Sequence, residues 1–354
     1  MKNGSLFHGF AQGRTRPCQG SDARDVGRRG LIGRREFLVG GGTAALAGCA
    51  GLGGARPVRF LVTADVHYRP GIFPHDTPEQ LERIVARGVA EDVDFGIQLG
   101  DFQHNATRDR AFIDRWNDAP FHALNVVGNH DDDATTAAET RAALRLERGW
   151  YRYDCGGVRV IVLDTNYALI DGRYVHYARD CGFVQWKLPK GAGMRLHPDE
   201  FPFLEESLDS APGVCVVASH RSFFGDDPDA QRVRAIFAAA NRARPGRVTL
   251  ALNGHNHCDL LRVREGVSYY TVNSPNHCWI PLKHTAYPAE DMRRWTGIDH
   301  IVAYDGTPLS AIVTLTPDGR FSVKGMSGGF WRDVQPAQIS PKFANLTASI
   351  KDRT

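Results

Sequence analysis

The sequence predicts an α/β fold for the body of the chain, which begins near Arg56. Short apolar runs alternate there with amphipathic helical segments, and each apolar run ends in polar residues. This βαβ rhythm is typical of a sheet whose ligand sites gather at the carboxyl ends of its strands. The chain has 354 residues, of which 42% are hydrophobic and 23% charged, so its body can bury a large core and is not disordered.

The first part of the body contains three predicted strands and two predicted helices. A helical pattern begins at Thr77, which we expect to be the N-cap, with Pro78 at the first helical position. A second helical segment covers residues 109–117. The predicted strands span residues 58–63, 95–99 and 123–127.

The second part of the body changes character. Residues 151–155 and 158–164 are separated by Gly156-Gly157 and predict a hairpin. We therefore expect a second, more antiparallel sheet to begin there. Residues 173–198 lack a clear period, which predicts a long functional loop. Further strands are predicted at residues 214–219, 248–252, 260–263, 268–272, 299–304, 311–315 and 321–324.

The first 48 residues differ from the body in charge. They contain five more basic than acidic residues, so the rest of the chain carries a net charge of −2, against +3 for the whole. A nearly neutral body argues against a protein that binds a phosphate backbone, and no nucleic-acid partner is expected. No stretch of the body approaches the roughly 20 apolar residues of a membrane span.

Residues 1–48 are predicted to be an export signal. The segment Gly33-Arg34-Arg35-Glu36-Phe37-Leu38 precedes residues 39–47, an apolar run of the kind found in signal peptides. Its Arg-Arg-x-Phe-Leu core resembles the twin-arginine signal, although Gly33 stands where Ser or Thr is usual and Val39 where Lys is frequent. The resemblance implies recognition by the twin-arginine export machinery, which moves folded proteins.

Leu46-Ala47-Gly48-Cys49 resembles a bacterial lipobox, in which Cys49 would be lipidated and become the mature N-terminus. A plain cut after Ala47 is the alternative; lipidation is favoured because the cysteine falls at the lipobox position. We therefore expect an exported protein, either periplasmic or anchored to the outer face of a membrane, with residues 49–57 as a tether. Five cysteines remain, and their pairing stays open: Cys155, Cys181, Cys215, Cys258 and Cys278.

Residues with metal-ligand chemistry follow five of the predicted strands. Carboxylate, amide and imidazole donors without a thiolate suit Mn, Fe or Zn ions. The Asp-x-His and His-x-His spacings would put both side chains on one face of an extended segment, and glycines 100, 128 and 254 leave room for close approach. His-x-His alone is a moderate signal and the other motifs alone are weak ones, but five in order indicate a site. The candidates are Asp65, His67, Asp101, Asn129, His130, His220, His255 and His257.

With these motifs the chain resembles the calcineurin-like metallophosphoesterases. The family pattern of Asp-x-His, Gly-Asp, Gly-Asn-His-Asp, a lone His and Gly-His-x-His is matched throughout. The matching segments are Asp65-Val66-His67, Gly100-Asp101, Gly128-Asn129-His130-Asp131, His220 and Gly254-His255-Asn256-His257. The resemblance covers residues 58–325, leaves residues 326–354 as a C-terminal extension, and implies a four-layer α/β/β/α sandwich.

The resemblance also implies a mechanism. Two divalent or trivalent ions, Mn, Fe or Zn, would activate a hydroxide that attacks a phosphoester. Asp101 would bridge both ions, and His130 would face the substrate and stabilise the transition state or protonate the leaving group. The first ion would be held by Asp65, His67 and His257, and the second by Asn129, His220 and His255.

Three functions stay open at this point. They are a phosphoesterase that acts on a small phosphomono- or phosphodiester, a surface-tethered binding protein that kept the fold without turnover, and a nuclease. The complete ligand set and His130 favour the first. Six residues could contact the substrate or could equally well pack or lie in solvated loops: His104, Arg221, Phe223, Phe224, His277 and Trp279.

Overall fold

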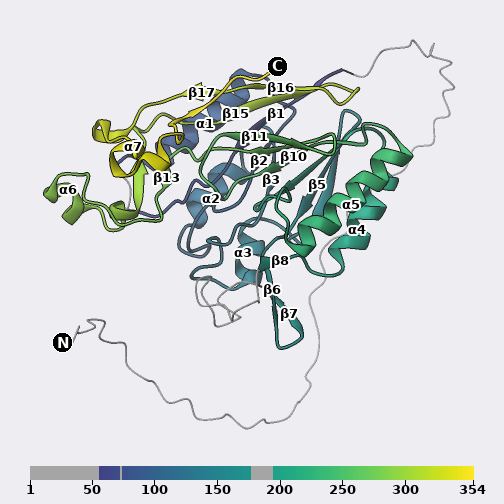
Figure 1. Ribbon diagram of the computed structural model, residues 1–354, viewed down its shortest axis with the longest axis horizontal. Coiled ribbons are helices and arrows are strands. Elements are labelled where there is room, and N and C mark those ends of the chain that lie inside the picture. Colours follow the sequence, from purple (N-terminus) through teal and green to yellow (C-terminus); the bar gives the residue numbers. More distant parts are fainter. Residues whose placement is uncertain (1–55, 72–73, 177–193) are drawn as a thin grey trace, which may run out of the picture. The chain divides into compact units, whose positions relative to one another are not determined.

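The computed structural model describes residues 56–71, 74–176 and 194–354 (Figure 1). The predicted export signal, Cys49 and Cys181 lie outside the described residues. The described chain forms two large mixed sheets of five and six strands, together with three small sheets. An α/β fold built on two sheets was the prediction, and it is confirmed.

The five-stranded sheet has the order β16-β15-β1-β2-β3. Its three parallel strands are β1 (Val58–Thr63), β2 (Phe95–Gln98) and β3 (His122–Asn125). The strands β15 (Ala311–Leu315) and β16 (Phe321–Lys324) extend the sheet on the other side of β1 in antiparallel pairs. Strands from both ends of the domain therefore share one sheet.

The six-stranded sheet is not more antiparallel than the first, so that expectation was wrong. The predicted hairpin of β4 and β5 is present, but β5, β9, β10 and β12 are joined by parallel pairs. Parallel neighbours need crossover connections. Two helices that the sequence analysis did not identify supply those from β5 to β9 and from β9 to β10, α4 (Glu200–Asp209) and α5 (Pro228–Ala243), whereas the chain passes from β10 to β12 through β11. In sheet order the strands are β11 (Leu260–Arg264), β12 (Val267–Thr271), β10 (Val248–Asn253), β9 (Cys215–Ser219), β5 (Val158–Leu163) and β4 (Tyr151–Cys155).

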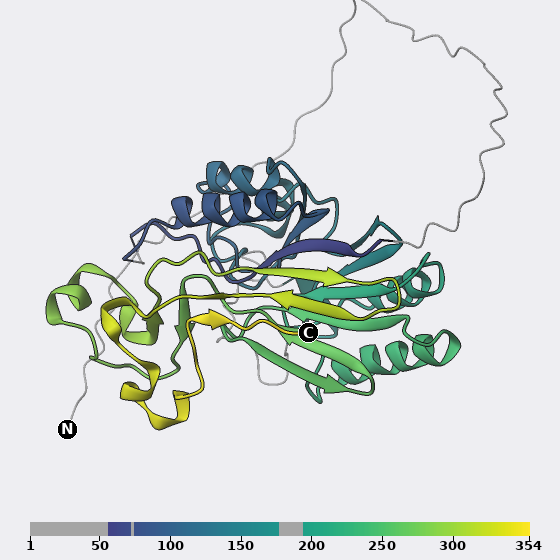
Figure 2. The same ribbon diagram turned by 90° about the horizontal axis from the view of Figure 1, so that it is seen from above.

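Three apolar cores separate four layers of strands and helices, and Figure 2 shows these layers from above. One core joins the two sheets, a second lies under α4 and α5, and a third lies under α1 (Thr77–Ala90), α2 (Arg110–Asn117) and α3 (Ala137–Ala143). Successive side chains of a strand point into different cores: Phe60 and Val62 of β1 face the other sheet, whereas Leu61 faces the helices. The four-layer α/β/β/α sandwich is confirmed.

Two local predictions need correction. Asp76, not Thr77, caps α1, because its carboxylate accepts a hydrogen bond from the backbone N–H of Glu79. The predicted loop at residues 173–198 contains β7 (Arg173–His176) and β8 (Met194–Arg195), which pair with β6 (Tyr167–Ile170). Residues 177–193 lie outside the described residues.

The remaining short elements lie after the second sheet. Strand β13 (His277–Trp279) pairs with β14 (Ile301–Ala303), and α6 (Ala289–Arg294) lies between them in sequence. The C-terminal residues form β17 (Met326–Ser327), α7 (Pro336–Ile339) and β18 (Ser349–Ile350), and Ile350 packs into the core between the sheets. Among the described residues no helix is both long and apolar enough to span a membrane, and Cys155, Cys215, Cys258 and Cys278 are free thiols.

Candidate metal centre

The predicted site residues follow the carboxyl ends of β1, β2, β3, β9 and β10. Residues from both sheets come together at these strand ends. Pairing between neighbouring strands continues into the loops, because the backbone N–H of Asp65 donates to the carbonyl of Gly100 at 3.0 Å and that of His67 to Asp101 at 2.8 Å. Between the sheets, the backbone N–H of His255 donates to both carboxylate oxygens of Asp65 at 2.9 Å. The site is therefore assembled by the sheet architecture.

One group of candidate ligands comes from β1, β2 and β10. Nε2 of His67 lies 3.1 Å from Nε2 of His257, and the latter lies 3.5 Å from Oδ1 of Asp65. Oδ2 of Asp101 lies 3.6 Å from Nε2 of His67. These four side chains are buried.

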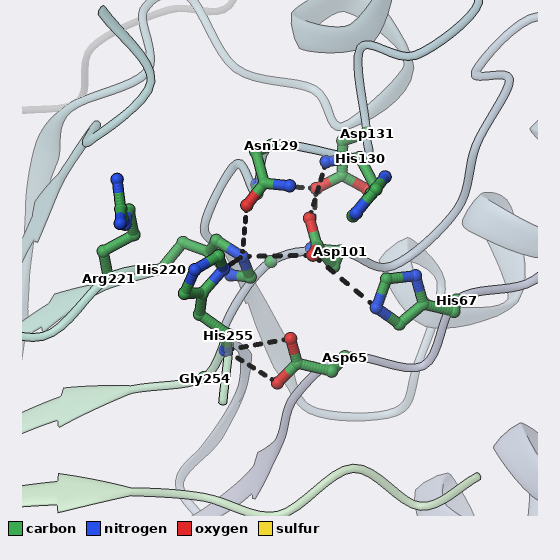
Figure 3. A network of polar contacts seen from close by, with 12 residues as sticks. Asp65, His67, Asp101, Asn129, His130, Asp131, His220, Arg221, Gly254 and His255 are labelled. Carbon is green, nitrogen blue, oxygen red and sulfur yellow. Dashed lines mark hydrogen bonds and ion pairs between the residues drawn. The ribbon is translucent and has the colours of Figure 1, made fainter. Parts of the chain in front are cut away.

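A second group surrounds His220. Its Nε2 lies 3.1 Å from Oδ1 of Asn129 and 3.2 Å from Nδ1 of His255. The same nitrogen lies 3.1 Å from Oδ2 of Asp101. Figure 3 shows Asp101 between the two groups, with His67 on one side and His220 on the other. One carboxylate oxygen is thus shared by both groups, and Asp101 belongs to two of the clusters whose atoms could hold a metal ion.

Outer hydrogen bonds leave the inner imidazole nitrogens available as ligands. Nδ1 of His220 donates to the carbonyl of Leu99 at 2.8 Å, and Nδ1 of His257 to the carbonyl of His277 at 3.3 Å. Because a carbonyl only accepts, each Nδ1 carries the proton and each Nε2 can offer a lone pair. Carbonyl acceptors of this kind are the usual outer partners of metal-bound histidines.

The backbone at the site is strained, which the sequence analysis did not anticipate. Asp65, His67, Asp101, His255 and His257 have φ between +47° and +68°, whereas the two x-separated pairs were expected to be extended. Left-handed backbone is costly for residues with a side chain and persists where the surroundings impose it. Through these tight turns Asp65 and His67 reach the same ligand group, whereas His255 and His257 reach different groups.

Glycines allow these turns to approach each other. A Cβ at Gly128 would lie 2.1 Å from the backbone nitrogen of Asp101, and a Cβ at Gly254 would lie 2.6 Å from Oδ2 of Asp65. The prediction that glycine at these positions allows the backbone and the site to approach each other closely is confirmed.

Comparison with known proteins decides the family. The family model for the calcineurin-like phosphoesterases matches residues 58–259, more than half of the chain. The chain belongs to the calcineurin-like phosphoesterase family. It is accordingly a metal-dependent phosphoesterase, and its clustered His and Asp residues indicate a divalent metal centre.

One solved structure of low identity shares the fold, and a second is similar over part of its length. A dimetal phosphatase from Danio rerio is 15% identical with a TM-score of 0.50, covering 76% of this chain and 96% of that one. The NAD nucleotidase of Haemophilus influenzae is 11% identical with a TM-score of 0.42, covering 77% of this phosphoesterase but only 50% of that chain. This phosphoesterase therefore spans about half the nucleotidase. A comparison with curated proteins gave no match.

Burial keeps several imidazoles of this phosphoesterase neutral. It lowers the pKa of His257 to about 4, and it lowers the pKa of His67 and His255 well below the ordinary value. His220 differs: burial lowers its pKa too, but the carboxylate of Asp101 raises it to about 9. The carboxylate of Asp101 therefore favours a positive charge at His220, which either a proton or a metal ion can provide.

Two of the three successive aspartates after His130, Asp131 and Asp133, make separate contacts in the site that the sequence analysis missed. Asp131 accepts hydrogen bonds from the backbone N–H groups of Gly128, Asp101, Phe102 and Gln103 at 2.7–3.0 Å. It thereby holds together the two loops that carry Asp101 and Asn129. The run of three acidic residues after Gly-Asn-His was the available signal, but which groups each carboxylate faces depends on the fold.

Asp133 connects His130 with a second histidine. Its Oδ2 lies 2.8 Å from Nδ1 of His130 and 2.8 Å from Nδ1 of His104. Nε2 of His104 in turn lies 3.0 Å from Nδ1 of His67. A chain of hydrogen bonds therefore runs from a candidate ligand through Asp133 to His130. Although burial lowers the pKa of His130, Asp101 and Asp133 raise it to about 9.

The six residues with open roles separate into two kinds. His104 and His277 lie against the first ligand group, Trp279 lines a cavity beside it, and Arg221 lines another cavity with His255. Figure 3 shows Arg221 next to His220. Phe223 is buried in the core under α5, so packing explains it, and Phe224 lies beneath the guanidinium of Arg262.

Proposed function

We propose that this protein hydrolyses a small phosphomono- or phosphodiester with two metal ions held by the groups that meet at Asp101. The observation that carries the proposal is the convergence of buried lone pairs. Nε2 of His67 faces Nε2 of His257 at 3.1 Å, and Nε2 of His220 faces the oxygens of Asn129 and Asp101 at 3.1 Å. Contacts between acceptors are favourable only with a cation or a proton between them.

The donor set fits the proposed ions. Asp65, His67 and His257 would hold the first ion, and Asn129, His220 and His255 the second, with Asp101 shared. Imidazole and oxygen donors without thiolate suit Mn, Fe or Zn. When bound, such ions neutralise charge on a phosphoryl group and increase the acidity of a water molecule.

The chain itself would manage the leaving group. The carboxylate of Asp133, 2.8 Å from Nδ1 of His130, stabilises the protonated imidazole, so that His130 can donate a proton to the departing alkoxide. Asp133 orients that imidazole by accepting from Nδ1, which leaves Nε2 as the donor toward the substrate. Arg221, half-buried beside the second group, can offer charge to a phosphoryl oxygen.

The test combines metal analysis with turnover. The purified protein is stripped with a chelator, reloaded separately with Mn, Fe or Zn, and assayed against phosphomonoesters, phosphodiesters and single-stranded nucleic acid. We expect about two equivalents of metal and turnover of small esters. Metal binding without turnover of any ester would instead support the surface-tethered binding protein, and preference for nucleic acid would support a nuclease.

The proposal includes an export route. Residues 1–48 would direct the folded protein to the twin-arginine machinery, and Cys49 would anchor it by lipidation to the outer face of a membrane. What supports this is the sequence pattern around Arg34, Arg35 and Cys49. A folded export route is compatible with an enzyme that acquires its metals before it crosses the membrane.

A further inference from the structure

A cavity of about 240 Å³ opens beside the first ligand group. Its lining includes His67, His130 and His277 from the metal centre, and Trp279, His300 and Ile301 from the β13–β14 region. Ligand pockets usually measure roughly 300 Å³ or more. This cavity is therefore suited to one part of a substrate whose phosphoryl group lies at the metal centre.

Strand β13 fixes the position of Trp279 relative to the metal centre. Residues two apart on a strand share a face, so Trp279 stands on the same side as His277, while Cys278 is buried on the other. The ring of His277 lies 4.4 Å from that of His257 and 5.4 Å from that of His67, between ring centroids. Pairing of Trp279 with Ile301 holds the strand end in place.

Packing in the apolar core does not explain Trp279, because most of its side chain is exposed. Its exposed fraction is 52%, although the preceding residues of β13 are buried. The ring of His300 lies parallel to it, at 8° between planes and 6.2 Å between centroids. A largely exposed indole with a parallel neighbour is suited to stacking with a further flat ring.

We infer that this cavity receives a planar aromatic leaving group, which stacks on Trp279. The inference rests on the proposed phosphoesterase function, because His130 lines the same cavity and thereby marks the side from which the alcohol departs. In the reaction, water forms the new P–O bond and releases a proton to solvent, the P–O bond to the alcohol breaks, and the alcohol oxygen takes the proton held by His130, which solvent then restores. Preferred substrates are thus phosphoesters whose alcohol carries a flat ring, of which a nucleoside is the simplest probe.

A matched pair of substrates isolates the ring. Adenosine 5′-monophosphate and ribose 5-phosphate share the same primary alcohol and differ in the base, and their methyl esters provide the same comparison for diesters. We expect kcat/KM to be about tenfold or more higher for the adenosine compound. Trp279→Ala should lower this value by about tenfold, mainly through KM, and leave the ribose compound within about twofold, as stacking on an aromatic side chain predicts.

Two further variants control for folding. Trp279→Phe keeps a flat ring and should retain most of the preference. Leu282→Ala removes another exposed apolar side chain nearby, 49% exposed and outside the lining of the cavity, and should change neither substrate. Equal kcat/KM for both substrates in the wild type, or equal losses in Trp279→Ala, would overturn the inference.

Calorimetry with adenosine separates this inference from the phosphoesterase proposal. Adenosine should bind the wild-type protein and bind Trp279→Ala about tenfold more weakly, whereas ribose should not bind. Binding of adenosine without turnover of any ester would leave the cavity assignment intact and refute the enzymatic one. Turnover of esters with no detectable adenosine binding would refute the cavity assignment alone.

Discussion

The imidazole of His220, directly after β9, donates a hydrogen bond to the carbonyl of Leu99, directly after β2, over 2.8 Å. This bond crosses from one sheet to the other and turns Nε2 toward Asn129 and Asp101. Because the two residues belong to different sheets, the geometry of the proposed second metal site depends on the packing between the sheets.

Asp101→Asn should abolish turnover and lower bound metal from two equivalents to one or none. The carboxylate is shared by both ligand groups, so the amide would remove negative charge from both. Metal content of the purified protein provides the measurement. Asp226→Asn, at an exposed carboxylate paired with Arg264, is the control and should keep both metals. Two ions retained in Asp101→Asn with normal turnover would contradict the shared role.

His130→Ala should keep both metals yet slow the hydrolysis of esters with poor leaving groups by roughly 10² or more, the scale of general acid catalysis. Activated aryl esters should lose less, because their leaving groups need little protonation. Steady-state rates on the two substrate types check this. Equal losses on both would indicate stabilisation of charge in place of proton transfer.

Asp133→Asn should slow the same poor substrates, because Asp133 acts through His130. Its carboxylate accepts from Nδ1 of His130 over 2.8 Å, and the amide would accept less strongly. If Asp133 acts through His130, the two losses in rate are not additive. Adding Asp133→Asn to the His130→Ala variant should then lower the rate by little more than about twofold. Independent, multiplying losses in the double variant would assign Asp133 a separate function through His104.

The stability of the protein should fall as pH rises from about 4 to about 7, where Asp132 loses its proton, and further above about pH 6.5, where His176 loses its proton, within one buried cluster. His176 lies 2.9 Å from Asp164 and 3.3 Å from Asp132. Burial raises the pKa of Asp132 to about 7 and that of Glu200 well above its ordinary value. Burial lowers the pKa of His176, but Asp164 and Asp132 outweigh it and raise that pKa.

The sign follows from proton uptake. Groups with raised pKa bind more protons in the folded state, so the free energy of unfolding decreases as pH rises. The contribution of His176 is complete below its unfolded pKa and is lost as pH rises through its folded pKa. The pKa of Asp164 is lowered, so its contribution to the free energy of unfolding is lost only as pH falls into the acidic range. Thermal unfolding at a fixed metal concentration should show the decrease, and Asp132→Asn should make it shallower; an unchanged slope would exclude this cluster as its cause.

Cys49→Ser should release the protein from the membrane or leave it unprocessed, if lipidation anchors it. Two or three acyl chains contribute about 0.8 kcal/mol per buried CH₂, enough for stable attachment. Replacing Arg34 and Arg35 by Lys should hold a folded precursor in the cytoplasm. Intact mass of the exported wild type provides the decisive measurement, since a chain beginning at Cys49 without acyl mass would refute lipidation.

The sequence by itself determined the fold class and the eight residues of the candidate site. Both depend on local pattern: short apolar runs between turn residues form strands, and Asp-x-His or Gly-His-x-His brings its residues to a strand end whatever the distant chain does. The glycines before the ligands were readable for the same reason, because the lack of a Cβ is a property of the residue.

Only the tertiary structure decided how these residues are connected. The parallel pairing of β5, β9 and β10 in the second sheet followed from α4 and α5, which the sequence analysis did not recognise. The carbonyl of Leu99 for His220, the four backbone groups for Asp131 and the paired histidines for Asp133 come from segments far apart in the chain. Hydrogen bonds of this kind depend on distances between packed sheets and loops, which residue spacing does not encode locally.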